Sequence, residues 1–134
     1  RTNGLGIVRE YWLGDEQVSA STRLKPGDKL TVRLTVKADR DMDFVQIKDE
    51  RASCMEPVVQ LSGYHWNGGI GYYQVNKDAS TEFFIDQMRK GTYVLEYTVY
   101  LDRPGTYQAG IATIQSAYAP EFNGHTDGVE LTIE

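Results

Sequence analysis

The stretch from residue 91 to residue 111 constrains the fold most, because its apolar side chains alternate with a period of two. In an extended chain one face would carry Tyr93, Leu95, Tyr97, Val99 and Leu101, and the other face Thr92, Glu96 and Thr98. Residues 102–105 read Asp-Arg-Pro-Gly, which is typical of a turn, and the alternation resumes at Tyr107, Ala109 and Ile111. We predict one long hairpin with a buried face that the rest of the chain must cover.

Other stretches alternate in the same way. The clearest is residues 29–37, where Leu30, Val32, Leu34 and Val36 share one face. Residues 7–13 fit an edge strand, and further short strands are predicted at residues 44–48, 72–75, 82–85 and 129–133. We expect a turn at residues 39–41, an irregular segment at 53–64, a hairpin turn at 67–69, one helical turn at 86–90 and a loop at 123–128.

No segment of the chain sustains the 3.6-residue period of an amphipathic helix. Roughly seven to nine short strands separated by turns rich in Gly, Asn and Asp are typical of an immunoglobulin-like sandwich. The fold class we predict is therefore all-β, an antiparallel two-sheet immunoglobulin-like sandwich, with a closed barrel as the lesser alternative.

Composition limits the classes of partner. The chain has 134 residues, enough for one domain with a core, and a net charge of -5, which argues against binding the phosphates of nucleic acids. No apolar run approaches the ~20 residues of a membrane helix, so we expect no direct membrane insertion. Because the chain starts at Arg1, we expect it to be part of a longer protein. Cys54 is the single cysteine and cannot form an internal disulfide.

The residues that could carry catalysis or bind metal do not form a recognised pattern. Cys54 has no histidine in a motif with it, so we interpret it as a structural thiol, and His65 and His125 make a poor zinc set. Asp39, Asp41, Asp43 and Glu50 match positions of a calcium loop, but Phe44 stands where that loop needs glycine. We predict no catalytic residue, no metal and no cofactor, and we interpret residues 49–51 (Asp-Glu-Arg) as a solvated strand end.

Four aromatic side chains surround the Gly-rich turn at residues 67–69: Tyr64, Trp66, Tyr72 and Tyr73. Aromatic residues near a hairpin often cap a core, but such a group can also stack on sugar rings. The alternative function is therefore a carbohydrate-binding module of a secreted multidomain protein. A structural spacer in an adhesin-like chain is a further option.

Several ordered stretches resemble a known family. They are residues 47–51 followed by Glu56 and Pro57, residues 83–86, residues 91–97, and residues 117–122, which read Ala-Tyr-Ala-Pro-Glu-Phe. In this order and spacing the chain resembles the C-terminal macroglobulin-like domain of bacterial alpha-2-macroglobulins. The resemblance covers residues 20–134, and residues 1–19 would be the end of a linker or the first strand of the domain.

The resemblance implies both the fold and the setting of the domain. Such domains are non-enzymatic β-sandwich modules of large protease inhibitors in the bacterial periplasm or cell envelope. The parent protein traps a target protease, and in many members a separate helical domain carries a thioester. Neither that helical domain nor the bait region lies in this chain, so the expected partners are other domains of the parent and, through it, target proteases.

The resemblance also implies a contact site. In thioester-bearing members a Met-Tyr pair followed by Pro-Glu packs over the thioester. Tyr118 matches the tyrosine, and Pro120 and Glu121 match the residues that follow, but Ala117 replaces the methionine. From these four residues we predict an interdomain contact. Independently, Ala119 precedes a proline and should be extended, so this segment is expected to leave the sheet as a projecting loop. On such a loop Tyr118 is either a lid over its own core or a contact for a neighbour. The resemblance favours the contact and implies that Tyr118 is at least partly exposed.

Overall fold

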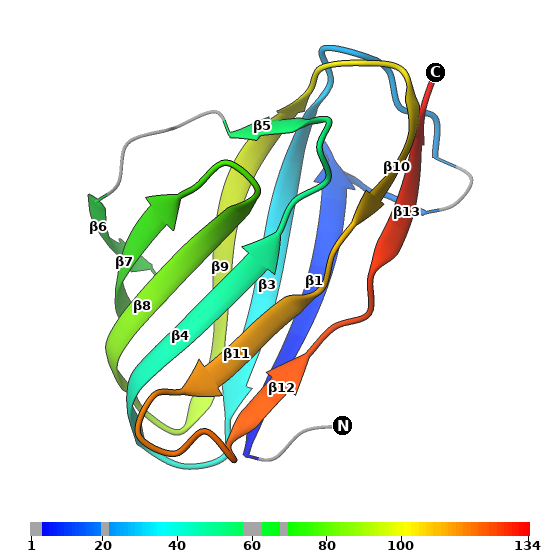
Figure 1. Ribbon diagram of the computed structural model, residues 1–134. Coiled ribbons are helices and arrows are strands. Elements are labelled where there is room, and N and C mark those ends of the chain that lie inside the picture. Colours follow the sequence, from blue (N-terminus) through cyan, green and yellow to red (C-terminus); the bar gives the residue numbers. More distant parts are fainter. Residues whose placement is uncertain (1–3, 20–21, 58–62, 68–69) are drawn as a thin grey trace.

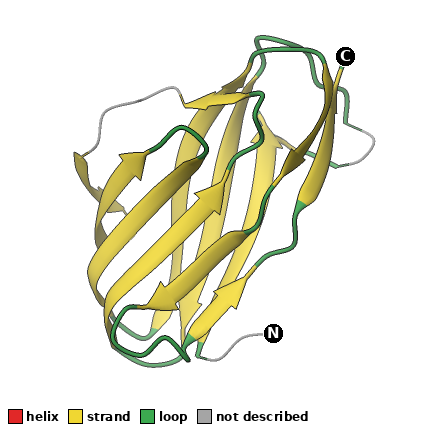
Figure 2. Cartoon of the chain, in the orientation of Figure 1, coloured by secondary structure: helices red, strands yellow, loops and turns green. Residues whose placement is uncertain are grey.

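A computed structural model describes residues 4–19, 22–57, 63–67 and 70–134. Within these ranges the chain is all-β and forms an antiparallel two-sheet sandwich, which confirms the predicted fold class (Figure 2). The described residues contain no helix that is long and apolar enough to cross a membrane.

The first sheet packs the two best alternating stretches side by side. Its strands, in spatial order, are β2 (Glu16–Gln17), β1 (Leu5–Leu13), β3 (Lys29–Ala38), β9 (Gly91–Leu101) and β5 (Met55–Pro57) (Figure 1). β3 pairs with β9 along its whole length, from Lys29 opposite Tyr100 to Ala38 opposite Gly91. The predicted inward faces of both strands are buried. Residues directly opposite each other in an antiparallel pair point to the same face of the sheet, and this register places the apolar residues of β3 opposite those of β9.

The second sheet lies across the core from the first. Its strands, in spatial order, are β12 (Asn123–His125), β11 (Ala112–Ser116), β4 (Met42–Glu50), β8 (Ser80–Met88), β7 (Ile70–Asn76) and β6 (Gly63–Asn67). A separate two-stranded sheet joins β10 (Gly105–Ala109) to β13 (Val129–Ile133). Figure 1 shows this small sheet continuing the β11–β12 edge beside the last part of β1.

The core fills the space between the two main sheets. Leu30, Leu34 and Leu95 of the first sheet face Ile47 and Phe83 of the second, and all five side chains are buried. At roughly 25 cal/mol per Å² of apolar surface removed from water, burial of such side chains is the main stabilising term. The expected turn at residues 39–41 lies between β3 and β4.

The long hairpin predicted for residues 91–111 is wrong. β9 pairs with β3 and β5, whereas β10 pairs with β13 in the small sheet. The edge of β9 next to the turn is occupied by β5, with Met55 opposite Leu101. Gly105 has a φ of 141°, a conformation that favours glycine, and there the chain leaves the first sheet. Alternation therefore predicted both strands but not their partners.

Three shorter predictions are also wrong, in whole or in part. The helical turn expected at residues 86–90 is instead the end of β8, because Met88 pairs with Met42 and extends the ladder. Within the loop expected at residues 123–128, residues 123–125 form β12, in which Gly124 lies opposite Ile114 of β11. β5 likewise lies within the stretch 53–64 that was expected to be irregular. The turn predicted at 67–69 falls partly outside the described residues, although β6 and β7 pair as the two arms of a hairpin.

Candidate functional site

A buried ion pair joins the two main sheets. Arg9 lies on the inward face of β1 after Ile7, and Asp49 continues the inward series of Val45 and Ile47 on β4. Arg9 Nη1 donates to Asp49 Oδ1 at 2.6 Å, and Asp49 is 0% exposed. The interpretation of residues 49–51 as a solvated strand end is therefore wrong for Asp49. Its position in the apolar series was the signal that could have revealed this.

Tyr97 of β9 completes the cluster by donating its hydroxyl to Asp49 Oδ2. Burial raises the pKa of Asp49, and the nearby Arg9 guanidinium and the Tyr97 hydrogen bond oppose that rise. Burial also raises the pKa of Tyr97 well above its ordinary value, so the phenol stays protonated and remains a donor. Both oxygens of the carboxylate are thus engaged.

Arg9 also holds two loops with its remaining donors. Its Nη2 donates to the carbonyl of Gly110 at 2.5 Å and to the carbonyl of Asp127 at 3.3 Å. These contacts tie β1 to the connection between β10 and β11 and to the segment that precedes β13. Because the described partners occupy both terminal nitrogens, the arrangement acts as a structural clamp across the sandwich.

Arg51 is buried as well, which contradicts its predicted exposure. Its Nη1 donates to Thr81 Oγ1 at 2.6 Å, and its Nη2 donates to the carbonyls of Lys77 and Asp78. The side chain therefore fastens the β7–β8 turn to the end of β4. Glu50, between the two buried residues, points to the opposite face and is exposed, as predicted.

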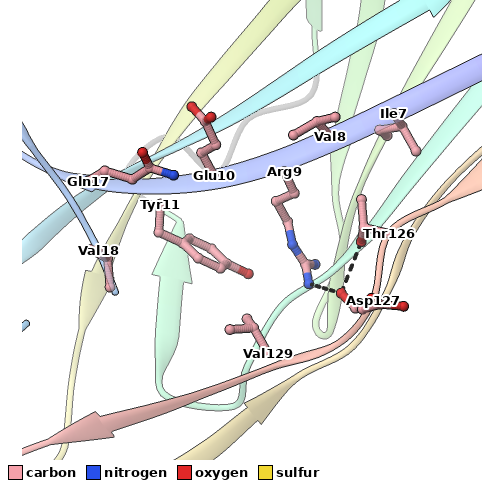
Figure 3. Close-up of a pocket in the computed structure, with 10 residues that line it drawn as sticks. All are labelled: Ile7, Val8, Arg9, Glu10, Tyr11, Gln17, Val18, Thr126, Asp127 and Val129. Carbon is pink, nitrogen blue, oxygen red and sulfur yellow. Dashed lines mark hydrogen bonds between the residues drawn. The ribbon is translucent and has the colours of Figure 1, made fainter. Parts of the chain in front are cut away.

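A cavity of about 370 Å³ lies beside the ion pair, between β1 and the start of β13. It is lined by Ile7, Val8, Arg9, Glu10, Tyr11, Gln17, Val18, Thr126, Asp127 and Val129. Figure 3 shows Arg9 and Tyr11 pointing from β1 toward the segment that carries Asp127 and Val129. Tyr11 is 6% exposed, and its hydroxyl has no hydrogen-bond partner among the described residues. Burial raises the pKa of Tyr11, so its phenol is a donor at neutral pH.

Tyr118 lies on a projecting loop between β11 and β12 and is 77% exposed. This confirms the exposure predicted for it. Its ring meets the ring of Phe44 edge to face, with centroids 5.0 Å apart, and Phe44 is itself 45% exposed. Phe44 has a φ of 56°, which is unusual for a side chain other than glycine and is a form of local strain. Two aromatic rings thus form an apolar tip at one end of the sandwich.

The other predicted contact residues share this loop. Ala117, Pro120 and Glu121 are all exposed. Two hydrogen bonds hold the loop: the backbone N of Ala117 donates to the carbonyl of Phe44 at 2.8 Å, and the side-chain Nδ2 of Asn123 donates to the carbonyl of Pro120 at 2.7 Å. The fold therefore brings the four predicted residues together on one fixed surface loop. Whether another domain contacts them stays a prediction.

Cys54 is buried between β4 and β5, and burial raises the pKa of its thiol to about 11. Such a thiol is protonated at neutral pH and is a weak nucleophile. The buried position agrees with the interpretation of Cys54 as a structural residue.

The aromatic group around residues 64–73 is divided between the core and the surface. Tyr72 is 4% exposed and packs against Phe83, with ring centroids 5.6 Å apart, whereas Tyr73 is exposed on the outer face of β7. The side chains of Tyr64, His65 and Trp66 lie outside what the structure describes. Tyr72 belongs to the core and cannot form part of a sugar-stacking surface.

Two residues of the calcium-like pattern have protein partners of their own. Asp39 accepts from Arg40 Nε at 2.8 Å, an interaction that lowers the pKa of this carboxyl. Asp41 accepts from the backbone N–H of Lys90 at 2.8 Å. In the part of the chain that the structure describes, no group of three or more His, Cys, Asp or Glu residues is placed to hold a metal ion.

Comparison with known proteins shows which family this chain matches. Residues 4–121 match the model of the family described as the bacterial alpha-2-macroglobulin MG10 domain. The chain is 27% identical over 158 residues to an alpha-2-macroglobulin homolog from the cyanobacterium Nostoc, covering 100% of this chain and 8% of the relative. It is 25% identical over 138 residues to circularly permutated Ras protein 2 of Dictyostelium discoideum, covering 98% of this chain and 4% of the relative.

Solved structures show the same fold at lower identity. An alpha-2-macroglobulin mutant from Salmonella matches with a TM-score of 0.80 and 22% identity, covering 99% of this chain and 9% of that one. Trypsin-activated alpha-2-macroglobulin from Escherichia coli matches with a TM-score of 0.80 and 18% identity, covering 100% of this chain and 10% of that one. The chain thus corresponds to one small part of each of these much longer proteins.

Proposed function

This chain belongs to the family of bacterial alpha-2-macroglobulin MG10 domains, and we propose that it is a non-enzymatic terminal module of a bacterial alpha-2-macroglobulin-like protease inhibitor. In this role residues 20–134 form the body of the module with β1 as its first strand, and the domain packs against a helical thioester-type domain of the same parent to hold its resting state. The parent, and through it the target protease, would act in the periplasm or cell envelope.

The exposed position of Tyr118 is the observation that carries this proposal. An aromatic ring that is 77% exposed leaves a large apolar area in water, and contact with another domain would remove that area. Its edge-to-face contact with Phe44 and the backbone hydrogen bonds of the loop hold the ring in place. A side chain that is already fixed loses little conformational freedom on docking.

The neighbouring residues suit a contact of this kind. Ala117 and Pro120 are small or rigid and allow another domain to approach the loop closely, and Glu121 adds a charge at its edge. The exposed ring of Phe44 adjoins Tyr118 and would enlarge the apolar contact. An aromatic centre with a polar rim is the usual arrangement of a protein interface.

The experiment compares Tyr118→Ala with Tyr100→Ala in the intact parent protein. Tyr100 is also exposed but lies on the outer face of β9, away from the loop. Because Tyr118 is exposed, its loss should change the stability of the isolated domain by no more than ~1 kcal/mol. In the parent we expect Tyr118→Ala to loosen the resting state and Tyr100→Ala to leave it unchanged.

The readout depends on the chemistry of the parent. If the parent carries a thioester, Tyr118→Ala should accelerate its reaction with methylamine; if it does not, limited proteolysis of the resting state should become faster. Equal rates for the wild type and Tyr118→Ala would show that the ring covers only its own loop. The isolated domain is expected to show no peptidase, esterase or glycosidase activity.

A further inference from the structure

One edge of β1 has backbone groups that no described strand pairs. The backbone N–H of Val18 donates to the carbonyl of Tyr11 at 2.7 Å, so this carbonyl points away from β3. In a strand, the N–H and C=O groups of every second residue point to the same side, so those of Ile7 and Arg9 share this direction. β2 pairs with β1 only at Trp12 and Leu13, and at the other end of this edge Gly124 of β12 lies against the carbonyl of Leu5. Within the described part of the chain, Ile7 and Arg9 lie between these two neighbours without a strand partner on this edge.

The cavity beside the ion pair lies along this open edge. Its volume of about 370 Å³ is within the ~300–1,000 Å³ range of ligand sites. Ile7, Val18 and Val129 give it apolar walls, and Arg9 and Tyr11 point into it (Figure 3). An apolar hollow next to unpaired backbone donors and acceptors matches the needs of an extended peptide, which offers side chains and main-chain groups in alternation.

The hydroxyl of Tyr11 is a second, independent sign that a ligand binds here. Tyr11 lines the cavity, and its buried hydroxyl has no hydrogen-bond partner among the described residues. Such a group is costly to leave unsatisfied in a folded protein. The phenol is protonated and can donate a hydrogen bond to a carbonyl that enters the cavity.

The charges around the cavity indicate the chemistry of the partner. The guanidinium of Arg9 is neutralised by Asp49, so it contributes little net charge to the cavity. Glu10 and Asp127 remain at the rim, and Asp127 is exposed. The rim is therefore acidic and favours a basic side chain on whatever binds there.

From these observations we propose that the edge of β1 from Ile7 to Tyr11 binds an extended segment of a partner protein, which adds to the sheet as a further strand. The segment pairs with the backbone of Ile7 and Arg9 and places an apolar side chain against Val129. One of its carbonyls accepts from the Tyr11 hydroxyl, and a Lys or Arg lies beside Asp127. This site is separate from the Tyr118 loop and does not depend on the proposed function.

The test uses a synthetic peptide and the ¹⁵N-labelled 134-residue chain. The peptide has the sequence Lys-Val-Thr-Val-Thr-Val-Lys with blocked ends, so that it is extended, partly apolar and basic. Its control has proline in place of the central valine, because proline lacks the N–H that strand pairing needs. We expect the first peptide to shift the amide signals of Ile7 and Arg9 most and to slow their hydrogen exchange at least tenfold. The proline peptide should have neither effect.

Two variants test the side-chain contacts. Tyr11→Phe removes only the hydroxyl and should weaken binding about 2- to 12-fold, the range expected for one hydrogen bond. It should not lower the stability of the free chain, since the hydroxyl has no described partner to lose. Tyr100→Phe, on the exposed outer face of the same sheet, is the matched control and should leave the affinity unchanged. Val129→Lys places an ammonium group in the cavity and should weaken binding at least tenfold.

Three results would overturn the proposal. In the first, the peptide at millimolar concentration leaves the amides of Ile7 and Arg9 unshifted. In the second, the proline peptide binds equally well, which would make the cavity a site for small apolar ligands. In the third, sedimentation shows that the free chain self-associates through this edge, which would make a second copy the occupant. If Val129→Lys fails to fold, the comparison of Tyr11→Phe with Tyr100→Phe still decides whether the hydroxyl takes part.

Discussion

Removing one member of the buried Arg9–Asp49 pair should destabilise the fold more than removing both. Asp49 is fully buried and the Arg9 side chain is 2% exposed, so neither charge can be hydrated if the other is lost. Asp49→Leu leaves a buried guanidinium without a counter-ion, and Arg9→Met leaves a buried carboxylate. Each single change should lower the free energy of unfolding by about 3–5 kcal/mol.

The double variant leaves no uncompensated charge. Its remaining cost comes from the Tyr97 hydroxyl and from the carbonyls of Gly110 and Asp127, which lose their partners. Leaving a buried polar group unpaired costs about 1–3 kcal/mol, and the two carbonyls lie near the surface. We therefore expect the double variant to lose about 1–3 kcal/mol, less than either single variant. For 134 residues a total stability of about 7–20 kcal/mol is ordinary, so all three variants should fold.

Urea unfolding at pH 7, followed by circular dichroism, measures these differences if the slope against urea stays constant. The control is the exposed pair Arg33–Glu96 on the outer face of the first sheet, whose atoms are also 2.6 Å apart. Glu96→Gln should change stability by about 0–1 kcal/mol, because water already solvates both charges. Additive losses in the Arg9–Asp49 double variant, about 6–10 kcal/mol in all, would refute the argument that the charges compensate each other.

Four further outcomes are expected. Leu95→Ala should lower the free energy of unfolding by about 2–5 kcal/mol, since Leu95 is fully buried, and an unchanged urea midpoint would show that the inward face of β9 is misassigned. Gly124→Ala should lower the free energy of unfolding by about 1–3 kcal/mol, because its Cβ would lie 2.7 Å from the carbonyl of Leu5. Its control is Gly14→Ala, whose Cβ would lie in open space, so that this variant tests the effect of backbone conformation alone. Burial in the folded chain raises the pKa of the Cys54 thiol from 9.0 to about 11. The free energy of unfolding should therefore fall as the pH rises from about 9 to about 11, because only the unfolded chain loses the thiol proton there. Cys54→Ala should remove this part of the decline. At pH 8 a thiol reagent should modify Cys54 much faster in urea than in the native chain, and equal rates would contradict its burial.

Local patterns in the sequence predicted the strands well. The alternation of Leu30 to Val36 and of Leu95 to Leu101 correctly identified the buried faces, because period-two geometry is a property of each strand alone. The loop at Tyr118 was also predicted from local features, since a proline disfavours continuation of the strand. The helical turn at residues 86–90 was wrong because pairing with β4 overrides weak local preference.

The buried ion pair was missed because its partners are distant in the sequence. Arg9 and Asp49 are each flanked by apolar inward positions, so their direction could be read from alternation. That they meet depends on the two sheets closing over one another, and charged residues are rarely buried unless paired. Treating residues 49–51 as one charged stretch obscured the fact that Asp49 and Glu50 point to opposite faces.

The sequence by itself determined that this chain is a β-sandwich, which side of each long strand is buried, and that the segment carrying Tyr118 leaves the sheet as a loop. Only the tertiary structure decided that β9 and β10 separate, that Arg9 reaches Asp49, and that the edge of β1 at Ile7 and Arg9 lies beside a cavity lined by Tyr11. The physical reason is the separation along the sequence over which each interaction acts. Side-chain alternation and turn chemistry act between near neighbours, whereas strand pairing and the burial of charge depend on which distant segments compete for the same edge.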